Sequence, residues 1–91
     1  MQRLAETPDV RLRRLRMRSA RRGMREMDLI LGPFADATLQ ALSLEEIDAY
    51  ETVLSENDQD LYKWICGRDK VPTAHEAIVG RVKTFLAARM S

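Results

Sequence analysis

The chain has 91 residues, of which 45% are hydrophobic, 32% are charged and 5% are aromatic. A chain of this length can bury only one small core, so the sequence predicts a single folded domain and excludes a two-domain protein. Because aromatic residues are few, the core must consist mainly of Leu, Ile, Val, Met and Ala, a composition that favours helices over sheets.

The net charge of +1 hides an uneven distribution of charge along the chain. Residues 1–25 contain nine arginines and two acidic residues, which is a net charge of +7. Residues 26–91 contain six basic and twelve acidic residues, which is a net charge of −6. A basic end favours binding to nucleic acid, to acidic lipid or to an acidic protein or cofactor surface, and composition does not choose among these partners.

The cysteine content and the length of the apolar runs bear on the cellular compartment. Cys66 is the only cysteine, which excludes an intramolecular disulfide and a Cys-rich metal site and indicates a reducing compartment. Apolar runs such as residues 29–31 are far shorter than the roughly 20 residues that span a bilayer. We expect a soluble cytoplasmic protein without membrane insertion. The mitochondrial matrix is the alternative, although the arginine-rich start continues into the first motif without the break expected after a transit peptide.

The N-terminal region predicts a short flexible segment followed by a helix. Residues 1–9 are expected to be flexible, with Asp9 as the N-cap of a helix that begins at Val10. In this helix Leu12 and Leu15 are sparse among arginines, so it can bury only a narrow stripe. Its other faces must contact water or a partner.

A second helix is predicted over residues 24–42, where apolar residues recur at steps of three and four. Gly32 and Pro33 fall inside this pattern. Because proline lacks a backbone donor and clashes with the preceding turn, we expect a kink or a short break there.

A capping box formed by Ser43 and Glu46 predicts a third helix from Leu44 to about Ser55. Such a helix needs a buried stripe at steps of three and four residues. Its predicted buried face consists of Leu44, Ile47, Leu54 and either Tyr50 or Glu51.

Two further helices complete the predicted fold. Asn57 or Asp58 can cap a short fourth helix that ends at Gly67 and places Trp64 in the core. Thr73 and Glu76 match a second capping box, which predicts a fifth helix running close to the C-terminus. The sequence therefore predicts an all-α protein, with residues 10–91 forming a compact antiparallel five-helix bundle.

The residue types that catalysis requires are scarce. No nucleophile with a base, metal-binding cluster or phosphate-binding loop is recognisable, so we expect neither an enzyme nor a metal site. His75 is predicted to be an exposed polar residue, and Cys66 a small core residue. The acidic residues Glu56, Asp58 and Asp60 lack the spacing of a calcium loop and are interpreted as a solvated helix start.

The segment from Arg21 to Glu26 is the part of the chain that local structure explains least well. Gly23 could let the chain turn between two helices, while Arg22 and Glu26 form an i,i+4 pair worth at most roughly 0.3 kcal/mol. Four like charges around one turn repel one another, which favours a site used by a partner. The residues alone leave a solvated turn and a docking site both open.

Several short motifs, in order and in register, resemble a known family. They are Arg22-Gly23-x-x-Glu26, Asp28-Leu29-Ile30-Leu31, Pro33-Phe34, Ser43-Leu44-x-Glu46 and Asp60-Leu61-Tyr62-x-Trp64. Over roughly residues 11–67 the chain resembles the small succinate dehydrogenase assembly factors, which are helical proteins that promote covalent flavin attachment.

The resemblance implies a partner and a site. The expected partner is the flavoprotein subunit of succinate dehydrogenase, or in the alternative that of fumarate reductase, and the factor would favour linkage of FAD to a histidine of that subunit. FAD would then be the cofactor of the client, and this chain would bind none stably. The resemblance assigns the functional motif to Arg22, Gly23 and Glu26. The candidate partner-binding residues are Arg21, Arg22, Gly23, Arg25, Glu26 and Asp28.

Two other classes of function compete with this interpretation. The arginine-rich first helix could bind nucleic acid, but it has no base-stacking aromatic residue, so such binding would be weak and independent of sequence. An antitoxin-like regulatory protein that acts by binding a toxin or a cytoskeletal target is the second alternative. The sequence favours the assembly factor over both.

Overall fold

The structure is a computed structural model that describes the backbone of residues 6–90 and the side chains of residues 6–89. It contains five α-helices: α1 (Pro8–Ala20), α2 (Arg25–Thr38), α3 (Leu44–Leu54), α4 (Asp58–Ile65) and α5 (Glu76–Met90). Two 3₁₀ turns, η1 (Leu39–Ala41) and η2 (Thr73–His75), precede α3 and α5. Within residues 6–90 there is no β-strand, which confirms the all-α class.

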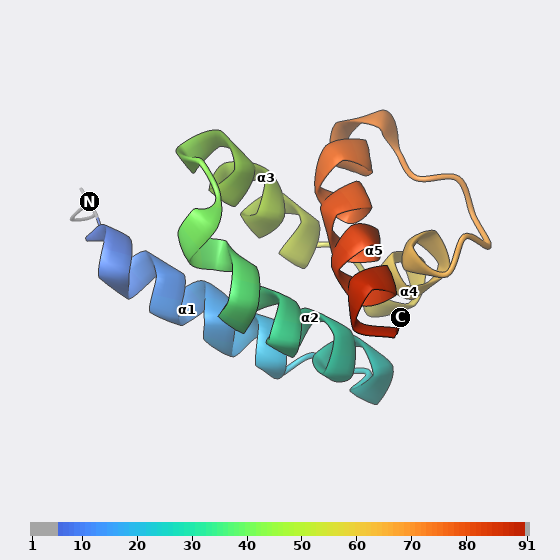
Figure 1. Ribbon diagram of the computed structural model, residues 1–91, viewed down its shortest axis with the longest axis horizontal. Helices are drawn as coiled ribbons and strands as arrows, with labels where there is room; N and C mark the ends of the chain where they lie inside the picture. The colour runs from blue at the N-terminus through green and yellow to red at the C-terminus, as the bar shows by residue number, and fades with distance from the viewer. Residues whose placement is uncertain (1–5, 91) are drawn as a thin grey trace.

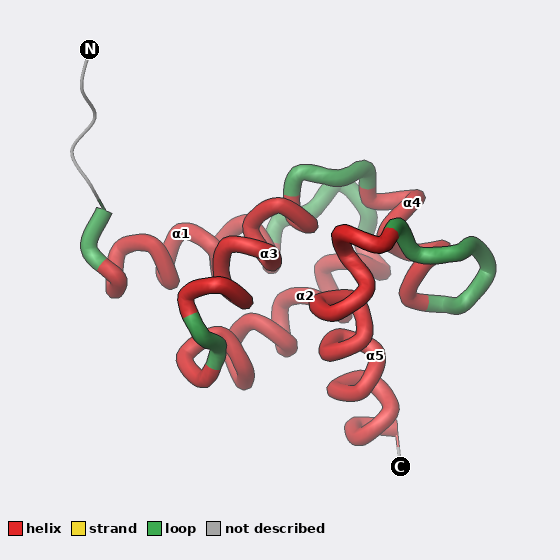
Figure 2. The backbone as a smooth tube through the Cα atoms, turned by 90° about the horizontal axis from the view of Figure 1, so that it is seen from above, coloured by secondary structure: helices red, strands yellow, loops and turns green. Residues whose placement is uncertain are grey.

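The helices are arranged around one shared core. α1 and α2 lie side by side and run in opposite directions, and α3 packs beside them (Figure 1). α5 crosses α2 at an angle rather than running alongside it, and the α4–α5 loop extends away from the core (Figure 2). The antiparallel arrangement is therefore seen in the α1–α2 pair, and α5 departs from it.

The first helix begins earlier than predicted. The Thr7 side chain, and not that of Asp9, caps α1 by accepting a hydrogen bond from the backbone of Val10 at 3.3 Å. Pro8 occupies the first helical turn, where its fixed φ suits a helix and its missing donor costs nothing. Of the predicted flexible segment, residues 1–5 lie outside the described residues, whereas residues 8 and 9 are helical.

The predicted caps of the third and fourth helices are confirmed. Ser43 and Glu46 form the reciprocal capping box of α3, and Asn57 caps α4 by accepting from the backbone of Gln59. Gly67 has a φ of 77° just after α4, the left-handed stop that glycine permits. The predicted capping box of Thr73 and Glu76 is wrong. The Glu76 N–H donates to the backbone carbonyl of Thr73, as part of the 3₁₀ turn η2, and not to the Thr73 side chain.

The predicted break at Pro33 is absent, since α2 is continuous from Arg25 to Thr38. Phe34 and Ala35 are buried next to the proline, and burial of an apolar face stabilises a helix more than local propensity does. Gly32 faces α1, and a Cβ added to it would make an ordinary contact, 3.7 Å from the Cα of Ala20, so the packing of the two helices does not require this glycine.

The core is mainly aliphatic, as the composition predicts. Trp64 is 9% exposed, which confirms its predicted packing role. Leu44 is 71% exposed, so its predicted place on the buried face of α3 is wrong, and Val53 is buried on that helix. The buried apolar residues are Leu15, Met27, Leu31, Phe34, Ala35, Leu39, Leu42, Ile47, Tyr50, Val53, Leu54, Leu61, Trp64, Ile65, Ile78, Val79 and Val82.

The Tyr50 hydroxyl links α3 to α1 inside this core. It donates to the Ser19 hydroxyl at 2.6 Å, and Ser19 in turn donates to the Leu15 carbonyl at 2.7 Å. Burial raises the pKa of Tyr50 to about 12, above the unfolded value of about 10. The folded state therefore holds this proton more tightly than the unfolded state does, and stability is lost as the pH rises from about 10 to about 12.

We predict that Tyr50→Phe weakens this alkaline loss of stability. Between pH 9 and pH 11 the wild type is expected to lose about 1 kcal/mol more of its free energy of unfolding than the variant. Urea unfolding at the two pH values measures the difference. Equal losses in the two proteins would show that titration of Tyr50 does not contribute.

Candidate functional site

The motif of the sequence lies in the loop between α1 and α2 and in the first turn of α2. Arg21, Gly23, Arg25 and Glu26 are exposed. The side chains of these three charged residues make no hydrogen bond or ion pair with any residue in the described part of the chain. They are therefore available to a partner.

Arg22 points inward, unlike its charged neighbours. Its Nε lies 2.6 Å from Asp58 Oδ1, and its side chain is 10% exposed. The two terminal nitrogens donate to the carbonyls of Leu54, at 2.7 Å, and Glu56, at 3.1 Å. The predicted i,i+4 pair with Glu26 is wrong, because the partner of Arg22 is 36 residues further along the chain.

The contacts of Arg22 suit the charges of the helix ends. The carbonyls at the end of a helix lack intrahelical partners and form its negative end, so a guanidinium there is favourable. Leu54 is the last residue of α3. Asp58 lies in the first turn of α4, where the positive end of the helix favours a carboxylate. Arg22 thus joins the end of α3 to the start of α4.

The backbone of the motif is held by two carboxylates. The Arg22 N–H donates to Asp28 Oδ1, and the Gly23 N–H donates to Asp58 Oδ2 at 2.9 Å. Asp58 therefore binds the Arg22 side chain with one oxygen and the Gly23 backbone with the other. We call the contacts among Arg22, Gly23, Asp28 and Asp58 the clamp.

The turn between α3 and α4 has a second attachment, through His75. His75 is 6% exposed, so the prediction of an exposed histidine is wrong. Its Nε2 lies 2.7 Å from Glu56 Oε2, and its ring centroid lies 5.6 Å from that of Trp64. Cys66, predicted to be a core residue, is exposed because it lies just beyond the last buried turn of α4.

Gly23 is not required by the backbone conformation. Among the glycines, all of which lie in the described part, only Gly67 has a positive φ. A Cβ added to Gly23 would lie 3.5 Å from Asp58 Oδ2, which is an ordinary contact. Beside Gly23 lies a notch of ≈ 370 Å³. The notch is lined by Gly23, Met24, Asn57, Asp58 and Gln59.

Comparison with known proteins assigns the family. A family model described as "Flavinator of succinate dehydrogenase" matches residues 13–86, which include the motif and the whole clamp. The chain belongs to this flavinator family.

Individual relatives of the flavinator family agree with this match. The chain is 42% identical over 64 residues to "Succinate dehydrogenase assembly factor 2, mitochondrial" of Lodderomyces elongisporus, covering 70% of this chain and 39% of that protein. It is 44% identical over 64 residues to the protein of the same name in Debaryomyces hansenii, covering 70% of this chain and 45% of that protein. It is 35% identical over 69 residues to "FAD assembly factor SdhE" of Haemophilus ducreyi, covering 75% of this chain and 84% of that protein. The matched part thus spans less than half of the two yeast relatives.

The basic surface of this family member is smaller than the sequence suggests. Arg11 pairs with Asp48 at 2.7 Å and with Glu51 at 2.9 Å, and Arg14 also contacts Glu51 at 2.9 Å. The hydrogen bond from Arg14, followed by that from Arg11, holds the pKa of Glu51 below its ordinary value. Since these arginines bind α3, they are not free to bind phosphate, which weakens the nucleic-acid alternative.

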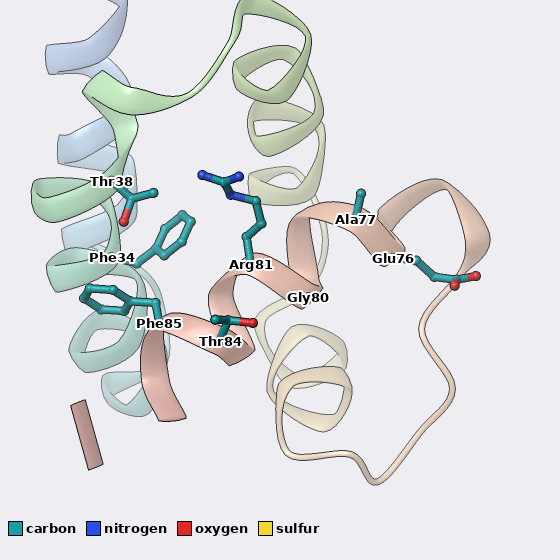
Figure 3. Close-up of a pocket in the computed structure, with 8 residues that line it drawn as sticks. All are labelled: Phe34, Thr38, Glu76, Ala77, Gly80, Arg81, Thr84 and Phe85. Carbon is teal, nitrogen blue, oxygen red and sulfur yellow. The ribbon is translucent and has the colours of Figure 1, made fainter. Parts of the chain in front are cut away.

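A second hollow of ≈ 640 Å³ lies between α2 and α5. Figure 3 shows the rings of Phe34 and Phe85 side by side in it, with centroids 5.6 Å apart. No residue of the motif or of the clamp lines this hollow. Arg81, which does line it, pairs with Glu46 of α3 at 3.0 Å. We call this hollow the α2–α5 groove.

Within the described residues there is no group of three or more His, Cys, Asp or Glu side chains that could hold a metal ion. None of the helices in that same part of the chain is long and apolar enough to cross a membrane.

Proposed function

We propose that this protein is an assembly factor that binds the flavoprotein subunit of succinate dehydrogenase and promotes covalent attachment of FAD to it. The observation that supports this proposal is the family match over residues 13–86, within which the exposed residues of the motif are held in one arrangement by the clamp. The names of the yeast and bacterial relatives fit the same role.

The proposed mechanism is positioning of the client. The flavoprotein supplies the histidine, the FAD and the charged groups that make the bond, and this chain stabilises the arrangement of client domains in which they meet. The protein is then a chaperone rather than an enzyme, and it binds no cofactor stably. The fumarate reductase flavoprotein remains an alternative client. The expected compartment remains the cytoplasm, with the mitochondrial matrix as the alternative, which the names of the yeast relatives fit.

The six candidate residues divide into two groups under this proposal. Arg21, Gly23, Arg25 and Glu26 are exposed and would contact the client. The other two, Arg22 and Asp28, are partly buried and bind within the chain, so they would shape the surface without touching the client.

The covalent flavin content of the client tests the proposal. In cells that lack this protein we expect the fluorescent flavoprotein band on a denaturing gel to disappear, and wild-type protein to restore it. Because Glu26 is exposed and makes no intramolecular pair within the described residues, Glu26→Ala is expected to fold normally and to restore the band poorly.

An exposed acidic residue elsewhere provides the control for this experiment. Asp36 is also exposed on α2, and Asp36→Ala is expected to restore the band fully. Unchanged fluorescence in cells without the protein would rule out the proposed function.

A further inference from the structure

The notch beside Gly23 has two walls that come from distant parts of the chain. One wall is the motif loop, with Gly23 and Met24, and the other is the start of α4, with Asn57 and Gln59. Gly23 and Asp58 are 35 residues apart in the sequence. The notch therefore exists only because the clamp holds these two segments together.

Asp58, the first residue of α4, also lines the notch. Both of its oxygens are occupied, one by the Arg22 side chain and one by the Gly23 backbone. Its charge is compensated by Arg22, and its side chain is only 17% exposed. At Asp58 the notch thus presents a neutral ion pair instead of a free carboxylate.

The α4 wall offers one free polar side chain. Asn57 is already used as the cap of α4, because its Oδ1 accepts from the Gln59 backbone at 2.8 Å. The Gln59 side chain is exposed and forms no hydrogen bond within residues 6–90. Its amide can therefore both donate to and accept from a partner.

We propose that the docking surface for the flavoprotein is composite, with a segment of the client seated in the notch against Gly23 on one wall and Gln59 on the other. The seated segment is an uncharged polar one, because it meets a compensated ion pair, a free amide and the apolar side chain of Met24. Asp58 is a positioning residue for this surface and does not contact the client's reacting atoms. The proposal rests on the proposed function, and it adds α4 to a site that the sequence motif confines to residues 21–28.

The decisive experiment compares two glutamines. Gln59 lines the notch, whereas Gln40 is also exposed, in η1, and lines neither the notch nor the α2–α5 groove. Purified flavoprotein subunit without flavin is incubated with FAD, and the rate of covalent attachment is measured against the concentration of the factor. Gln59→Trp is expected to raise the concentration for half-maximal rate at least tenfold, while Gln40→Trp matches the wild type.

A second variant tests the role of Asp58. Asp58→Asn keeps the shape of the side chain but loses the charge that binds Arg22. We expect it to raise the half-maximal concentration at least tenfold and to leave the rate at saturating factor unchanged, with the folded fraction checked by circular dichroism. A merely structural role would lower the amount of active factor in proportion to unfolding and would leave the affinity of the folded fraction unchanged.

The possible outcomes separate this inference from the proposed function. If the wild type does not accelerate attachment, the proposed function is wrong and the composite surface is wrong with it. If the wild type is active and Gln59→Trp behaves like Gln40→Trp, only the composite surface is overturned. If Asp58→Asn has wild-type affinity, its positioning role is overturned.

Discussion

Replacing Arg22 with alanine is expected to lower the free energy of unfolding by about 3 kcal/mol. The substitution leaves the carboxylate of Asp58 without its cation and the carbonyls of Leu54 and Glu56 without their donors. Asp58 is 17% exposed, so water replaces the guanidinium only in part. For a domain of this size the melting temperature should fall by about 15 °C.

Thermal and urea unfolding of the wild type and of three variants, Arg22→Ala, Arg25→Ala and Arg22→Lys, measure this effect. Arg25→Ala is the matched control, because Arg25 is exposed and makes no ion pair in the described part of the chain, and its stability should change by less than about 0.5 kcal/mol. Arg22→Lys should recover part of the loss, since an ammonium keeps the charge but not the fork that reaches three acceptors. Equal stability of Arg22→Ala and Arg25→Ala would contradict the clamp.

Replacing Gly23 with arginine is expected to have the opposite profile, with folding retained and binding lost. The first atom of the new side chain fits, because a Cβ would lie 3.5 Å from Asp58 Oδ2 and the φ of Gly23 is not positive. The rest of the side chain would occupy the notch or cover it. We expect binding to the flavoprotein subunit to weaken by about 100-fold, which corresponds to about 2.8 kcal/mol.

Calorimetric titration with the flavoprotein subunit, alongside thermal unfolding of the free variant, checks this prediction. Gly80→Arg is the control, since a Cβ at Gly80 meets no atom within 4 Å and the residue lines the α2–α5 groove instead of the notch. It should bind the client as the wild type does. Loss of binding in Gly80→Arg alone would place the docking site in the α2–α5 groove, and unfolding of Gly23→Arg would show that the fold requires this glycine.

The two variants separate two roles of the motif, because Arg22→Ala is expected to lower stability and Gly23→Arg to weaken binding to the client. Arg22 and Gly23 are adjacent in the sequence, but the side chain of Arg22 is 10% exposed whereas Gly23 is exposed. A variant that fails because it is unstable and a variant that fails because it cannot dock would give the same result in a cell-based assay. Unfolding measurements on the purified protein distinguish them.

Much of the helical architecture was predictable because it depends on contacts within one turn of the chain. The capping box of Ser43 and Glu46, the cap at Asn57 and the left-handed stop at Gly67 each involve residues no more than a few positions apart. The start of α1 was also encoded locally, in Thr7 followed by Pro8, but Asp9 offered a competing cap.

The sequence by itself determined the all-α class, most helix limits, the motif and the resemblance to the flavinator family. Only the tertiary structure decided that Arg22 points inward to Asp58, that His75 is buried against Glu56, and that Leu44 and Cys66 are exposed. The physical reason is the range of the interactions. Local hydrogen bonds and the helical period leave a pattern over three or four residues, whereas the partner of a charged side chain depends on the path of the chain, which here brings together residues 36 positions apart.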